Sequence, residues 1–127
     1  MSKFYAQLTQ EALLPASGPD ALTFLQGQVT CDASRVDTEH AIPGAYCTPQ
    51  GRTVCDFLLC QLGEEKYAMR LRRDLREQSA AVFGKYIIFS KAKLDPDDEQ
   101  WQLFCCWGEE VKQQLREIFG NVPEGQY

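Results

Sequence analysis

Four polar side chains follow an apolar stretch near the N-terminus, and their types point to ligand binding. Residues 21–25 carry apolar side chains at helical spacing, and the polar residues after them are Gln26, Gln28, Thr30 and Asp32. Amide, hydroxyl and carboxylate groups together donate and accept hydrogen bonds, as recognition of a heterocycle with mixed polar edges requires. The same groups also suit capping a helix end and fixing the loop after it. The residues alone leave both interpretations open.

Gly51, Arg52 and Lys91 are further candidates for a ligand site. Gly51 and Arg52 lie in a turn between two predicted strands, where a glycine permits a positive φ and a close approach of the backbone to a ligand. A plain hairpin turn accounts for the same two residues. Lys91 supplies a positive charge for a ligand carboxylate, although a lysine is also usual on an edge strand.

The pattern favours neither a metal site nor a catalytic triad. His40 is the only histidine, and no two of the six cysteines have the two-residue gap of zinc or iron–sulfur loops. We therefore expect His40 in a surface loop and the cysteines as free thiols with packing roles. Residues 95–99 are acidic without the ligand spacing of an EF-hand, so we expect a simple turn there. No catalytic or metal-ligating residue is predicted.

The charge and hydropathy of the chain exclude several classes of partner. A formal net charge of −5 and an isoelectric point near 4.8 oppose binding to a phosphate backbone, so no direct nucleic-acid contact is expected. No apolar run reaches the roughly 20 residues of a membrane span, and the N-terminus lacks the pattern of a secretory signal. A cytoplasmic protein without membrane contact is the prediction.

One basic cluster departs from the acidic character of the chain. Its members are Arg70, Arg72, Arg73 and Arg76. They fit a solvated strand end that runs into a helix. They also fit a site for a carboxylate or for the acidic patch of a partner, and the sequence leaves both possibilities open.

The order of apolar patterns and turn signals predicts an α+β fold, in which helices cover one face of an antiparallel sheet. A helix should begin at residues 17–20, with Ser17 as its N-cap, and end near residues 27–30. A second helix over residues 74–83 should stop at Gly84, and a third should cover residues 109–119. The predicted strands are residues 4–8, 13–16, 42–47, 53–62, 66–71, 86–94 and 100–107.

Three blocks of the sequence resemble YgfZ-type folate-binding proteins, which are relatives of the glycine-cleavage aminomethyltransferase. The blocks are residues 18–32, 48–52 and 84–98, in the family's order. The family's Lys-Gly-Cys-Tyr-x-Gly-Gln-Glu-like motif, from its second half, does not occur in this sequence. The resemblance therefore implies one β-β-α-β-β-β-α-like subdomain, the first of a folate-binding domain, over residues 1–120. Residues 121–127 are expected to be a linker or the end of the chain.

The resemblance also implies a ligand and a role. The cofactor is expected to be tetrahydrofolate or a related folate, with iron–sulfur enzymes as partners. Such proteins act in maintaining iron–sulfur enzymes and thereby affect tRNA modification. The cofactor-binding residues predicted from the matching blocks and their side-chain chemistry are Gln26, Gln28, Thr30, Gly51, Arg52 and Lys91.

One position departs from the aminomethyltransferase relatives. Cys55 stands where they have the first of two successive aspartates, which contacts the folate, and Asp56 stands at the second. A thiol there argues against aminomethyl transfer, so a folate-dependent one-carbon transferase is the weaker alternative. An interaction half-domain without a ligand is a third possibility. Asp56 is expected on the opposite face of its strand, towards solvent.

Self-association is expected for a subdomain that leaves an apolar face uncovered. In the predicted strand 100–107, one side carries Trp101, Leu103, Cys105 and Trp107. Copies of the chain are expected to pair through this side as a symmetric dimer.

Overall fold

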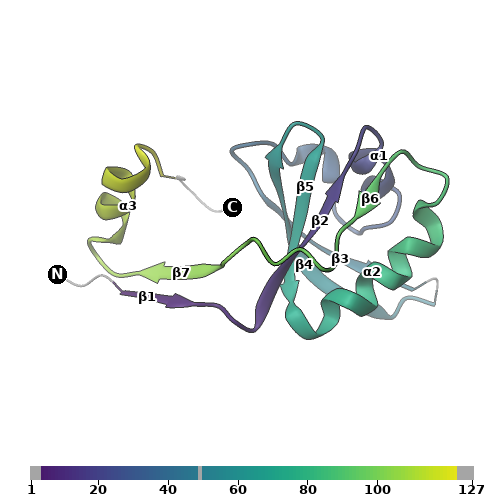
Figure 1. Cartoon of the computed structure of the whole chain (residues 1–127), viewed down its shortest axis with the longest axis horizontal. Helices are drawn as coiled ribbons and strands as arrows, with labels where there is room; N and C mark the ends of the chain where they lie inside the picture. The colour runs from purple at the N-terminus through teal and green to yellow at the C-terminus, as the bar shows by residue number, and fades with distance from the viewer. Residues whose placement is uncertain (1–3, 49, 123–127) are drawn as a thin grey trace.

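The computed structural model describes residues 4–48 and 50–122 and shows two antiparallel sheets and three α-helices (Figure 1). The larger sheet has five strands in the order β3-β4-β5-β2-β6, and the smaller pairs β1 with β7. This confirms the predicted α+β class. The elements are β1 Phe4–Gln7, β2 Glu11–Ser17, α1 Ala21–Gln26, the short 3-10 helix η1 Ala33–Arg35, β3 Ile42–Cys47, β4 Thr53–Gly63, β5 Lys66–Arg72, α2 Arg73–Ile87, β6 Lys93–Leu94, β7 Phe104–Trp107 and α3 Val111–Phe119.

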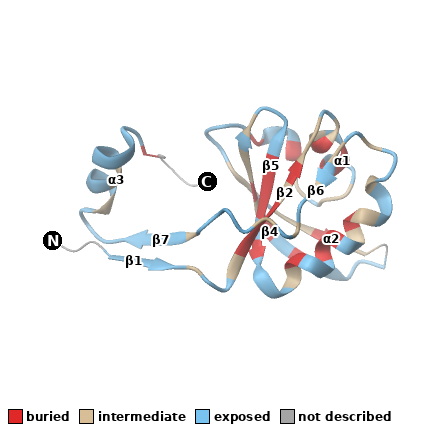
Figure 2. Cartoon of the chain, viewed as in Figure 1, coloured by how far each residue is buried: buried red, intermediate tan, exposed pale blue. Residues whose placement is uncertain are grey.

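The core lies between the five-stranded sheet and helices α1 and α2. Leu14 on β2 is paired in register with Met69 on β5, and both side chains are fully buried because alternate residues of each strand face the helices. Phe83 of α2 is also fully buried, with its ring 4.6 Å from that of Tyr46 and 6.2 Å from that of Phe24. Figure 2 shows the buried residues concentrated here, whereas β1, β7 and α3 are exposed.

The predicted central strands and the last helix are confirmed. Strand β3 has the predicted bounds, and β4 and β5 each extend one residue further. Helix α3 ends at Gly120, whose φ of +78° is the left-handed conformation that glycine adopts readily at a helix end. Residues 123–127, within the predicted terminal segment, lie outside the described residues.

The predicted helix start at Ser17 is wrong. Ser17 ends β2, where it pairs with Lys66 on one side and Lys93 on the other. The chain turns at Gly18, at a φ of +122°, and α1 begins after Asp20. A Cβ at Gly18 would lie 2.4 Å from the carbonyl oxygen of Lys91, so this turn requires glycine for close approach as well as for φ.

The predicted helix stop at Gly84 is also wrong, together with the predicted strand 86–94. Helix α2 continues through Gly84 to Ile87, and only Lys93–Leu94 forms a strand. A glycine inside a helix costs about 1 kcal/mol, which the burial of Phe83 one residue earlier can offset. Within the predicted strand, Tyr86 is 48% exposed and Phe89 is 93% exposed.

The predicted strand 100–107 forms only over its second half, as β7. Its first residues are held in another conformation, because the Asp98 carboxylate accepts hydrogen bonds from the backbone and the side chain of Gln100. Trp101 and Leu103 therefore precede the strand and do not continue the alternation of Cys105 and Trp107.

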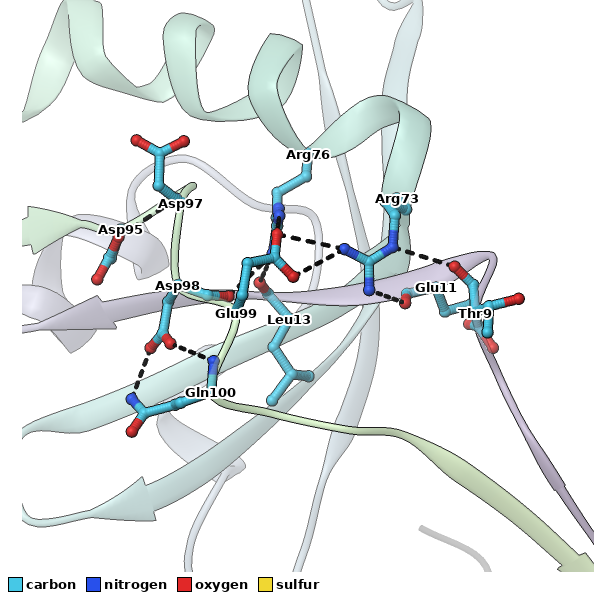
Figure 3. Close-up of polar contacts among 10 residues, drawn as sticks. All are labelled: Thr9, Glu11, Leu13, Arg73, Arg76, Asp95, Asp97, Asp98, Glu99 and Gln100. Carbon is cyan, nitrogen blue, oxygen red and sulfur yellow. Dashed lines mark hydrogen bonds and ion pairs between the residues drawn. The ribbon is translucent and has the colours of Figure 1, made fainter.

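Arg76 in α2 is buried, and its side chain forms hydrogen bonds with one segment that precedes α2 in the sequence and one that follows it (Figure 3). Its guanidinium donates to the carbonyl oxygens of Leu13, at 3.3 Å, and Asp98, at 3.1 Å. It also donates to the carboxylate of Glu99. Charged hydrogen bonds satisfy this buried cation, as burial of a charge requires.

Arg73, the first residue of α2, completes this arrangement (Figure 3). Its backbone N–H donates to the carbonyl of Gln10, and its side chain donates to the carbonyls of Thr9 and Glu11. It also pairs with Glu99 at 3.0 Å. We call Arg73, Arg76 and Glu99 the arginine clasp. It fixes residues 9–11 and 98–99, from which the two connections to the smaller sheet leave.

The arginine clasp decides between the two interpretations of the basic cluster, a solvated surface and a carboxylate site. Arg73 and Arg76 do bind a carboxylate, but it belongs to Glu99 of the same chain. The predicted solvated face is wrong for Arg76, which is 8% exposed, and holds for Arg72, which pairs with Asp74 at the surface.

Replacing Arg76 should destabilise the fold strongly. Arg76→Ala removes the donors to Leu13 and Asp98 together, so the free energy of unfolding should fall by about 2–3 kcal/mol. Arg72→Ala is the matched control and should change it by less than about 0.5 kcal/mol. Urea unfolding measures both, and equal losses would contradict the special position of Arg76.

The contribution of Glu99 to stability should depend on pH. Hydrogen bonds from Arg76 and Arg73 lower the pKa of Glu99 from its ordinary value of 4.5. A carboxylate whose pKa is lowered by folding stabilises the fold fully above its unfolded pKa and loses this effect as the pH falls through the folded pKa. The difference in unfolding free energy between wild type and Glu99→Gln should therefore be constant near neutral pH and shrink below about pH 4.5. Urea unfolding across this range tests it, and a difference that persists unchanged into acid would contradict it.

Candidate functional site

The polar turn after α1 lies against strand β3. The backbone N–H of Thr30 donates to the carbonyl of Ala45 at 2.9 Å, and the N–H of Ala45 donates to the Thr30 hydroxyl at 3.0 Å. Val29 forms an isolated bridge with Tyr46. These contacts place residues 26–30 beside the end of β3 that leads into the β3–β4 hairpin.

Two of the predicted polar residues also hold the local structure. The Gln26 side-chain oxygen accepts a hydrogen bond from the Ala33 N–H at 2.6 Å, which fixes the loop at η1. The Thr30 hydroxyl binds β3 as described. The loop-fixing interpretation is thus confirmed for both. The half-buried side chain of Gln28 makes no hydrogen bond with the residues that the structure describes, and the amide nitrogen of Gln26 is not used in the Ala33 contact.

The β3–β4 hairpin presents Gly51 and Arg52 on an open surface. Gly51 has a φ of +85° and donates its N–H to the carbonyl of Thr48 at 2.8 Å. A Cβ there would meet nothing within 4 Å, so the space above the glycine is free of described atoms. The exposed Arg52 side chain makes no ion pair with residues 4–48 or 50–122, while its backbone N–H donates to the Thr48 hydroxyl.

The structure therefore brings five of the six predicted binding residues to one end of β3 and places the sixth elsewhere. Lys91 lies just before β6, at the edge of the sheet opposite to β3. It is also near the β4–β5 hairpin, at the other end of the long strand β4, because Ser17 pairs with both Lys66 and Lys93. The backbone of Lys91, and not its ammonium group, makes the local contacts: its N–H donates to the Asp20 carboxylate, and its carbonyl accepts from the Asp20 N–H.

Cys55 and Asp56 lie on opposite faces of β4. Cys55 is paired with Tyr46 and only 2% exposed, and burial raises the pKa of its thiol more than the neighbouring Ser79 hydroxyl lowers it. The thiol is therefore neutral at pH 7 and faces the core. Asp56 is exposed, as predicted, and lies directly across from Ala45, which Thr30 holds in place. Asp56 thus shares a face of the sheet with Ala45, a proximity that only the strand register reveals.

A cavity of about 420 Å³ lies beside the residues that follow the polar turn, and Asp32 is its one lining residue that the sequence indicated as a possible ligand contact. It is lined by Cys31, Asp32, Arg35, His40, Ala41, Ile42 and Pro43. His40 is exposed in a loop, as predicted, and its Nδ1 lies 3.0 Å from the Asp37 carboxylate. All six cysteines are free thiols, as predicted, but the predicted packing role is wrong for Cys105 and Cys106, which are exposed. Among the described residues, no group of three or more His, Cys, Asp or Glu could hold a metal ion.

No helix within the described part of the chain is both long and apolar enough to cross a membrane.

The comparisons with known proteins give a fold and a family. No protein-family model matches the sequence. Among solved structures, the glycine cleavage system aminomethyltransferase T from Bartonella henselae aligns with a TM-score of 0.74 at 14% sequence identity, over 91% of this chain and 31% of that one. The tRNA-modifying protein YgfZ of Pectobacterium carotovorum (strain PC1) is 33% identical over 116 residues, which are 91% of this chain and 34% of that protein. The tRNA-modifying protein YgfZ of Escherichia coli O157:H7 is 34% identical over 112 residues, 88% of this chain and 34% of that protein.

The chain therefore has an α+β fold like that of the matching third of aminomethyltransferase T. Its sequence is of the YgfZ type, as the three blocks predicted, and it spans about a third of the length of these curated relatives.

Gly51 should tolerate substitution less well than Gly63. Gly51→Val forces a β-branched residue into a positive φ, which should lower the unfolding free energy by about 1–2 kcal/mol. Gly63 is not among the positive-φ glycines, and a Cβ there would meet only the Lys66 side chain at 3.9 Å. Gly63→Val is therefore the matched control with a smaller loss. Thermal and urea unfolding compare them, and equal losses would remove the distinction.

Proposed function

We propose that this chain is a folate-binding accessory protein of the YgfZ type, which acts in the maintenance of iron–sulfur enzymes and thereby in tRNA modification. The proposed ligand is tetrahydrofolate or a related folate, bound at the hairpin end of β3. The observation that carries the proposal is that the polar turn 26–30 lies against β3 near the end of this strand that leads into the hairpin with Gly51 and Arg52. The sequence blocks that resemble the folate-binding family contain these same two segments.

The side chains at this end of β3 fit the two parts of a folate. The amides of Gln26 and Gln28 offer donors and acceptors for the mixed polar edges of the pterin ring. The exposed Arg52 guanidinium suits a carboxylate of the glutamate tail, because it can donate two parallel hydrogen bonds. The open space at Gly51 lets the ligand approach the backbone. Lys91 is left out of this site because it lies at the opposite edge of the sheet.

Binding without catalysis is favoured over one-carbon transfer. Cys55 stands where the aminomethyltransferase relatives have a functional aspartate, and its buried, neutral thiol faces the core. It can neither stabilise positive charge on a folate nitrogen nor serve as a base at neutral pH. Asp56 keeps a carboxylate on the open face, where it adds an acceptor to the ligand surface.

The proposal predicts saturable folate binding that depends on Gln28 and Arg52. Calorimetric titration of tetrahydrofolate under anaerobic conditions should give a Kd below about 1 mM, and Gln28→Ala and Arg52→Ala should each weaken it about tenfold, as the loss of about 1.4 kcal/mol requires. Gln78→Ala and Arg72→Ala, exposed positions on and beside α2, are the matched controls and should bind as the wild type does.

Two results would count against the proposal. Absence of saturation with folded protein would leave an interaction domain without this ligand. Equal weakening by the control variants would show that binding is not located at the hairpin end of β3.

A further inference from the structure

The unit formed by β1, β7 and α3 stands apart from the five-stranded sheet, and most of its residues are exposed (Figures 1 and 2). Helix α3 has no buried side chain among its described residues. Six large apolar residues of the unit are 48–76% exposed: Phe4, Tyr5, Phe104, Trp107, Ile118 and Phe119. A two-stranded ribbon with one short helix is only marginally stable by itself in water, so we expect another surface to pack against these apolar side chains.

The register of the two strands divides these side chains between two faces. Tyr5 lies opposite Cys106, and the Tyr5 and Phe104 rings are 6.5 Å apart on the face that α3 flanks. Phe4 stacks on Trp107 at 5.5 Å on the other face, which also carries Cys105. A groove of about 450 Å³ runs between α3 and the first face. Its lining includes Tyr5, Phe104, Cys106, Ile118 and Phe119, and Phe4 at the start of β1 also contributes to it.

Strands β1 and β7 lack the charged side chains that would oppose association with another copy of the chain. Natural proteins protect exposed strands with charged residues, but β1 and β7 contain no charged side chain over their described lengths. An aromatic side chain can bury about 150–250 Å², so the exposed parts of the five large apolar residues that line the groove, which do not include Trp107, offer about 500 Å² per copy. This area is below the ~800 Å² per partner of a standard stable interface and corresponds to a weak, reversible dimer.

We propose that this surface binds a second copy of the chain, with the two grooves facing each other across a two-fold axis. In such an interface each copy contributes the same patch, so the assembly closes at the dimer. Ile118 and Phe119, at the exposed end of α3, enter the groove of the other copy. This dimer is independent of folate binding at β3.

The proposed dimer surface differs from the one that the sequence indicated. The expected side carried Trp101, Leu103, Cys105 and Trp107, but Trp101 and Leu103 precede the strand. Cys105 and Trp107 lie on the face away from the groove, whereas Cys106 lies in it.

Sedimentation velocity over a range of protein concentrations tests the dimer. The wild type should convert from monomer to dimer within about 5–200 µM, a range that corresponds to roughly 5–7 kcal/mol of association energy. Ile118→Glu and Phe119→Glu should each weaken association at least tenfold and, because both side chains are exposed, should keep the circular dichroism of the wild type. Phe89→Glu is the matched control, since Phe89 is 93% exposed outside the unit, and it should dimerise as the wild type does.

Position-resolved alkylation of the two neighbouring thiols provides a second readout. In Cys105→Ser protein the remaining strand thiol, Cys106, should react with iodoacetamide more slowly as the protein concentration rises. In Cys106→Ser protein the Cys105 thiol should react at a constant rate. A strictly monomeric wild type would overturn the proposal. The surface would then be a site for a different polypeptide. Equal weakening by Phe89→Glu, or equal protection of both thiols, would overturn it as non-specific association.

Discussion

The buried guanidinium of Arg76 is the constraint on which the rest of the structure depends. A cation removed from water must have its donors satisfied, and here carbonyl groups of two distant segments and one carboxylate satisfy them. Strand β2, helix α2 and the segment before β7 consequently have one relative placement in which all of these hydrogen bonds form. Arg73 repeats this arrangement one turn earlier and holds the residues that lead into β2.

The arginine clasp lies where the five-stranded sheet joins the unit formed by β1, β7 and α3, and the two parts have different surfaces. On one side, the five-stranded sheet carries a closed core and the hairpin end of β3, where the proposed ligand surface lies. On the other side, the paired strands β1 and β7 lead to an apolar unit with almost no core of its own. The proposed ligand surface and the apolar unit therefore do not share side chains.

The sequence predicted the features that depend on local pattern and failed where distant contacts decide. Alternating apolar residues between clear turn signals identified β3, β4 and β5 to within one residue. Residues 84–94 carry apolar side chains compatible with either period, and the packing of Phe83 against Tyr46 and Phe24 selects the helix. The sequence left a solvated face and an anion site both open for Arg76, because its partner Glu99 is 23 residues away.

The same distinction applies to the candidate site. Gln26 and Thr30 were identified from composition, and one of their two predicted roles, fixing the loop, is local and is confirmed. The separation of Lys91 from the other candidates follows from the strand order, which places β3 and β6 at opposite edges and which no short motif encodes. The proximity of Asp56 to the polar turn likewise needs the register of β3 with β4.

The position of β2 has a consequence for the time course of biosynthesis. This strand emerges from the ribosome before the other four strands of its sheet, yet it lies inside the sheet, between β5 and β6. Glu11 of β2 pairs with Arg72 of β5, which is synthesised about 3–12 s later at roughly 5–20 residues per second. During that interval the apolar residues of β2 have no sheet to join, so the nascent chain must carry an unpaired strand while its partners are translated. The order of synthesis is thus not the order of assembly, and the first part of the core to be made is among the last to be enclosed.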